Sequence, residues 1–121
     1  MNKDENIFKI KVILDYKIKS LSHFFDKCKC IKKITFNKFN NKDIANMSCM
    51  FCGCSSLEEL DLSDFSTNNV TDMDSIFHGC SSLEELNLSN FNINDETNID
   101  SMLMDCSEIL IEKIIEKNEK F

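Results

Sequence analysis

Four evenly spaced cysteines, Cys28, Cys54, Cys80 and Cys106, give this chain a 26-residue period. The segment CSSLEELDLSDF that begins at Cys54 returns almost unchanged at Cys80 as CSSLEELNLSNF. Self-similarity at a fixed period of about 20–50 residues indicates stacked units that each bury only part of their apolar surface alone. The chain is therefore predicted to consist of about four similar units.

Apolar residues keep the same 26-residue register, whereas the residues between them vary among Lys, Glu, Asn and Ser. Nine such columns are present, and each is predicted to form one line of the core. Four of these columns are Phe8, Ile34, Leu60, Leu86; Ile10, Phe36, Leu62, Leu88; Ile13, Phe39, Phe65, Phe91; and Phe25, Phe51, Phe77, Leu103.

Within one unit the apolar pattern changes its period. Leu60-Asp61-Leu62 alternates apolar and polar residues, as a half-buried strand does. Further on, Met73, Ile76 and Phe77 have the i, i+3, i+4 spacing of one helix face. Gly79 suits the left-handed residue that ends a helix. One strand and one short helix per unit are therefore predicted.

A strand with an LxxLxL pattern followed by a short helix is typical of a leucine-rich repeat. The predicted fold class is α/β: a leucine-rich-repeat solenoid of about four 26-residue strand–helix coils with a C-terminal capping helix. The predicted strands span 7–13, 33–37, 59–63 and 85–89. The predicted helices span 18–27, 44–52, 71–78 and 98–105.

The polar residues of the repeat carry a resemblance to a known family. Beside the apolar register stand the strings SSLEELDLS and NVTDM, within a motif that covers roughly residues 47–95. In these residues the chain resembles the BspA-like leucine-rich-repeat surface proteins. The resemblance implies a non-catalytic binding or adhesion module, exposed at a cell surface or secreted, and often part of a longer chain.

The chain is predicted to be one domain, 1–121, because no Pro- or Gly-rich linker divides it. Residues 1–27 form a degenerate first coil, 28–106 three regular coils, and 107–121 a capping helix that Ser107 begins and that ends near Asn118. The N-terminus has no uninterrupted apolar region of the secretory type. The chain is thus interpreted either as cytoplasmic or as a fragment without its export signal. No stretch has the roughly 20 apolar residues of a membrane helix, so no membrane insertion is expected.

Charge is distributed unevenly along the chain. Residues 1–42 hold eleven lysines and four acids, a balance of +7, and the remaining residues hold three lysines and seventeen acids, a balance of −14. Strand alternation places one set of side chains on the outer face of the predicted sheet, and this face is the candidate partner-binding surface. Its residues are Lys9, Lys11, Lys33, Thr35, Asn37, Glu59, Asp61, Ser63, Glu85, Asn87 and Ser89. The net charge of −7 argues against a nucleic-acid partner.

The seven cysteines are interpreted mainly as packed side chains and not as reactive or metal-binding groups. The evenly spaced set occupies a core column, where free cysteine acts as a small buried hydrophobe. Cys30, Cys49 and Cys52 lie off this column, and their short spacings allow a zinc interpretation, although paired short ligand loops are missing. Cys52, His78 and Asp26 could be drawn as a nucleophile, base and orienting group, but nothing in the sequence supplies an oxyanion hole. We therefore predict no catalytic residue, no metal site and no cofactor.

The leading functional hypothesis is a non-catalytic protein-interaction module with a protein partner. The alternative is a structural or assembly protein that associates with itself through its ends, because a basic first strand and an acidic second half are electrostatically complementary. We expect a monomer with weak, salt-sensitive self-association. An enzyme is not expected.

Overall fold

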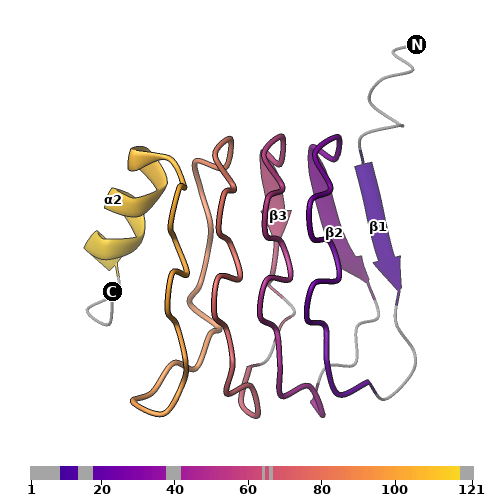
Figure 1. Ribbon diagram of the computed structural model, residues 1–121, viewed down its shortest axis with the longest axis vertical. Coiled ribbons are helices and arrows are strands. Elements are labelled where there is room, and N and C mark those ends of the chain that lie inside the picture. The colour runs from indigo at the N-terminus through magenta and orange to yellow at the C-terminus, as the bar shows by residue number, and fades with distance from the viewer. Residues whose placement is uncertain (1–8, 14–17, 38–41, 64, 66, 118–121) are drawn as a thin grey trace.

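The computed structural model describes residues 9–13, 18–37, 42–63, 65 and 67–117 (Figure 1). Its elements, in chain order, are strand β1 (Lys9–Ile13), strand β2 (Lys33–Asn37), strand β3 (Glu59–Asp61) and helix α2 (Glu108–Lys117). Successive segments run side by side from β1 at one end to α2 at the other (Figure 1). Residues 7 and 8 of the first predicted strand, Phe39 of one predicted core column, and Asn118 lie outside the described residues.

The three strands form a parallel sheet in the order β1, β2, β3. Lys33 of β2 lies opposite Glu59 of β3, a shift of one full period of the sequence. Lys33 also lies opposite Lys9 of β1, and this shift is two residues short of the period. The first repeat is therefore shorter than the pattern of apolar columns predicted.

The predicted register of the first strand is wrong by two residues. Ile34 lies opposite Ile10, not opposite Phe8 as the columns suggested. Side chains alternate between the two faces with a period of two, so a two-residue change preserves which face each side chain occupies. Lys9 and Lys11 therefore still project to the outer face, and both are exposed.

The four predicted helices, 18–27, 44–52, 71–78 and 98–105, are wrong, because these segments are series of turns. Each repeat contains two residues in the left-handed backbone region, whereas an α-helix requires φ near −63° throughout. Ser75, for example, has φ of 56° in the middle of the predicted helix 71–78. The left-handed positions recur once per repeat, at His23, Cys49, Ser75, Ser101 and at Lys27, Gly53, Gly79, Asp105.

The turns use their backbone amides in two directions, which a helix cannot do. The Ser75 N–H donates to the carbonyl of Asp100 in the following repeat, with 2.8 Å between N and O. The adjacent Ile76 N–H donates within its own repeat to the Met73 carbonyl at 3.2 Å. The alternation continues to Gly79 and recurs in the other repeats. These turns therefore form a second hydrogen-bonded connection between repeats, opposite the sheet.

The predicted leucine-rich-repeat solenoid of four strand–helix coils is accordingly wrong. The described residues contain three strands and one helix, and that helix follows the last repeat. The fourth predicted strand, 85–89, is not formed, and β3 is shorter than predicted. In both places a side chain captures an amide two residues on: Asp61 accepts from the Ser63 N–H at 3.0 Å, and Asn87 accepts from the Ser89 N–H at 2.9 Å. Such local bonds compete with strand pairing.

The core lies between the sheet and the turns, and its largest side chains are stacked phenylalanines. The ring of Phe51 lies nearly parallel to those of Phe25 and Phe77, with centroid distances of 5.7 Å and 5.9 Å. From the sheet side, Phe36 meets Phe65 edge-on at 4.7 Å. Phe51 and Phe77 are fully buried, as the predicted column requires.

Helix α2 closes the stack and confirms the helix predicted after Ser107. The Ser107 hydroxyl accepts a hydrogen bond from the Leu110 N–H at 3.1 Å, which is the geometry of an N-cap. The same hydroxyl donates to the Leu83 carbonyl of the preceding repeat at 3.0 Å. Leu110 and Ile114 are buried against the core, whereas the next residue after Ile114, Ile115, is 51% exposed.

Candidate functional site

The outer face of the sheet presents most of the side chains that were predicted to bind a partner. Parallel pairing places them in lines that cross the strands, because each strand is shifted by one repeat from its neighbour. The exposed members are Lys9, Lys11, Glu59, Asp61, Ser63, Glu85, Asn87 and Ser89, and the half-buried members are Lys33 and Thr35. The backbone of Asn37 lies in β2, and its side chain is outside the described residues.

A line of charges crosses this face from β1 to α2. Lys9 and Lys33 lie opposite each other, and the Lys33 ammonium lies 3.0 Å from a carboxylate oxygen of Glu59 on β3. Glu85 stands one repeat beyond Glu59, and its carboxylate lies 3.3 Å from the Lys113 ammonium of α2. The predicted change from basic to acidic along the stack therefore holds only up to Glu85, because α2 returns positive charge to the face.

The Asp61 carboxylate has a fixed position on this face. The Ser63 hydroxyl and the Ser63 amide both donate to it, and they hold the pKa of Asp61 below its usual value. Asn87 occupies the equivalent position one repeat later. Its neutral side chain accepts the equivalent hydrogen bond, from the Ser89 N–H. The outer face therefore has a negative charge at Asp61 that stays ionised at neutral pH.

A groove of about 610 Å³ is hollowed in the outer face beside α2. Its walls bring three carboxylates and two ammonium groups together. The lining residues are Glu58, Glu59, Leu60, Glu85, Leu86, Asn87, Lys113 and Lys117.

Three residues in this groove were predicted as site residues and three charged ones were not. Glu59, Glu85 and Asn87 belong to the predicted face. Glu58, Lys113 and Lys117 were missed, because strand alternation alone selects every second residue and says nothing of α2. The charged side of the predicted C-terminal helix was a usable signal for the two lysines. The predicted Lys9 and Lys11, in contrast, lie on β1, away from the groove.

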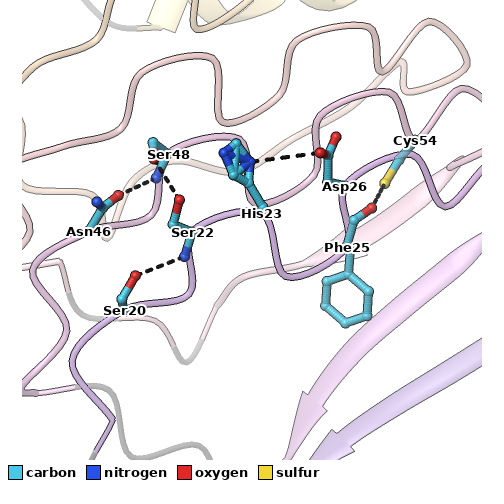
Figure 2. A network of polar contacts seen from close by, with 8 residues as sticks. All are labelled: Ser20, Ser22, His23, Phe25, Asp26, Asn46, Ser48 and Cys54. Carbon is cyan, nitrogen blue, oxygen red and sulfur yellow. Dashed lines mark hydrogen bonds and ion pairs between the residues drawn. The ribbon is translucent and has the colours of Figure 1, made fainter.

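The turns opposite the sheet carry polar residues that support the backbone (Figure 2). The Asn46 side chain accepts the Ser48 N–H at 2.8 Å, and Ser20 accepts the Ser22 N–H at 3.1 Å. The Ser22 and Ser48 hydroxyls, one repeat apart, are 2.9 Å from each other. Asp72 and Asn98 continue the row with equivalent turns. These contacts account for the repeated polar residues here without a ligand.

The column cysteines are packed thiols with little tendency to ionise. Burial raises the pKa of Cys54 from 9.0 to about 12 and that of Cys106 to about 11. Burial likewise raises the pKa of Cys80. Off the column, burial and a hydrogen bond with Cys49 raise the pKa of Cys52 to about 12. A thiol that stays protonated is a poor nucleophile and a poor zinc ligand.

The residues of the possible catalytic cluster do not come together as drawn from the sequence. His78 contacts Asp105 of the following repeat, with 3.2 Å between Nε2 and the carboxylate. Asp26 instead lies 3.7 Å from His23 within its own repeat. Over the part of the chain that the structure describes, no three His, Cys, Asp or Glu side chains are grouped so as to hold a metal ion.

The family model described as "Mycoplasma protein of unknown function, DUF285" matches residues 19–117. The chain belongs to this family. The region matched to DUF285 includes β2, β3, α2 and the whole groove, whereas β1 precedes it. No curated protein and no solved structure matches the chain. Within the described ranges, no helix is both long and apolar enough to span a bilayer.

Proposed function

We propose that this chain is a non-catalytic protein-interaction module that binds a protein partner through the outer face of its sheet. The proposal is carried by one observation, the line of charged side chains from Lys9 on β1 to Lys113 on α2. Charges fixed on a rigid sheet select partners by electrostatic complementarity more than by affinity. The polar residues on the opposite side support turns, which leaves the outer face as the better candidate.

The resemblance to BspA-like surface proteins supports the same class of function. That resemblance is carried by the polar strings of the repeat, including Glu58-Glu59 and Asp61 on the outer face. It supports a partner outside the cell, such as a surface or secreted protein. An adhesion role is the form of this proposal that an exported chain would have.

The proposal can be tested with a random peptide library displayed on phage and selected against the purified chain. The test variant is Glu59→Lys with Glu85→Lys, which reverses the acidic centre of the outer face. The matched control is Asp95→Lys with Glu96→Lys, which makes the same change in net charge at two exposed positions outside this face.

We expect selected peptides to bind the test variant at least about tenfold more weakly, and to bind the control within about twofold of the natural chain. Equal losses in both variants would mean that net charge, and not the outer face, attracts the peptides. Failure to enrich any binder, or binders insensitive to the outer-face change, would overturn the proposal.

A further inference from the structure

The groove beside α2 has an arrangement of charges that specifies its ligand more closely than the outer face as a whole does. Glu59 and Glu85 are neighbours across two repeats, and like charges at such positions repel each other. Each is paired with a lysine on its far side, Glu59 with Lys33 and Glu85 with Lys113. The two central carboxylates are therefore compensated before any ligand arrives.

Two further charges of the groove are not compensated. Among the described residues, neither the Glu58 carboxylate nor the Lys117 ammonium makes an ion pair, and both side chains are exposed. Glu58 precedes β3, where its N–H donates to the Lys32 carbonyl at 2.8 Å. Lys117 is the last residue of α2. The groove thus offers one free negative group from the segment just before β3 and one free positive group from the helix.

Between these two charges the groove has a size suited to a few side chains. A volume of about 610 Å³ lies within the range of about 300–1,000 Å³ that pockets for small ligands have. A short partner segment can therefore lie in the groove while its charged side chains reach both walls.

We propose that this groove binds an extended segment of the partner protein that presents one basic and one acidic side chain together. The Lys or Arg side chain of the segment pairs with Glu58, and its Asp or Glu side chain pairs with Lys117. A segment of one sign is disfavoured, because it would leave one of the two uncompensated charges facing its own kind. This inference rests on the proposed function and names the chemistry of the partner.

The test uses capped hexapeptides as probes, with two charged residues placed two positions apart so that both project from the same side of an extended chain. One pair of peptides carries Arg and Glu in the two possible orders, a third carries two Arg, and a fourth carries two Glu. Binding is followed through the backbone amide signals of the isotope-labelled chain by NMR. Glu58→Gln and Lys117→Gln remove the free charges, and Lys19→Gln is the matched control at an exposed lysine outside both the outer face and the groove.

We expect one of the two Arg/Glu peptides to shift the signals of Glu58, Glu85 and Lys117. Its Kd should rise about threefold to fivefold in either groove variant and stay unchanged in the control, as for exposed ion pairs. Tighter binding by a single-sign peptide, or no shift in the groove with any peptide, overturns the inference. Shifts confined to β1 and β2 also overturn it, while leaving the outer face as the interaction surface. The library selection against the outer-face variant decides the proposed function separately.

Discussion

Cys54 lies 29 residues beyond Phe25, and its thiol donates a hydrogen bond to the Phe25 carbonyl, with 3.1 Å between Sγ and O (Figure 2). The same carbonyl accepts the Cys28 N–H at 3.1 Å. The thiol therefore joins one repeat to the next at a carbonyl that also closes a turn. Equivalent bonds run from Cys80 to Phe51 and from Cys106 to Phe77. This explains why a small apolar residue with a donor stands at Cys54, Cys80 and Cys106.

The raised thiol pKa values predict that stability falls at high pH. In the unfolded chain these thiols ionise near pH 9, whereas Cys54 in the folded chain ionises near 12. The stabilisation is complete below pH 9 and is lost as the pH rises toward 12, because only the unfolded state releases its protons there. Each such thiol contributes a slope of up to about 1.4 kcal/mol per pH unit.

Urea unfolding between pH 8 and pH 10.5 measures this slope. The control is the double variant Cys54→Ala with Cys80→Ala, which keeps every lysine and tyrosine that also titrates in this range. We expect the dependence on pH to be flatter in the variant, whatever its absolute stability. Identical slopes would show that the column thiols are accessible to solvent in the folded chain.

Truncation of a core side chain should distinguish the two faces of the sheet. Leu62 and Leu88 are almost fully buried, so replacement of either by Ala should lower the free energy of unfolding by about 2–5 kcal/mol. Glu59→Ala should change it by less than about 0.5 kcal/mol, because the ion pair with Lys33 is exposed. Chemical denaturation measures both quantities. Equal losses at the two kinds of position would contradict the orientation of the sheet.

Gly79 should tolerate Asn better than Ala. Its φ is 78°, a conformation that Asn adopts more readily than Ala. A Cβ added there would lie 3.4 Å from the Cα of Gly53, an ordinary contact, so conformation and not space sets the cost. We expect Gly79→Ala to cost about 1–2 kcal/mol and Gly79→Asn less, as measured by urea unfolding. A larger loss with Asn would show instead that the approach of neighbouring repeats limits the side chain.

Self-association should be weak and sensitive to salt. β1 is at the edge of the described sheet and bears the exposed Lys9 and Lys11, whereas most acids lie in the later repeats. Helix α2 covers the other end of the stack, which opposes a continuous strand-to-strand contact (Figure 1). We expect monomers at micromolar concentration, with association at low salt that fades above about 0.15 M, where the Debye length is near 8 Å. In sedimentation experiments, a tight dimer insensitive to salt would indicate an apolar interface instead.

The helices were mispredicted because two different structures bury the same side chains. Met73, Ile76 and Phe77 are all buried, as the helical spacing predicted. A series of turns closed by bonds from residue i to i−3 also returns the chain to one face after three or four residues, so the apolar pattern does not distinguish it from a helix. The repeated Gly79 was read as the end of a helix, although it is one of two left-handed positions in each repeat.

The sequence by itself determined the period, the core columns of the central repeats, the outward face of the sheet and the C-terminal helix. The burial of a side chain and the face of the strand that it occupies depend on its near neighbours in the sequence. The repeat shows the same apolar pattern several times. Only the tertiary structure decided that the turns bond to the neighbouring repeat, since the partner of the Ser75 amide is an atom of another repeat, the Asp100 carbonyl. The groove likewise depends on the tertiary structure, because Lys117 of α2 lines it together with Glu58, which lies in a much earlier part of the chain.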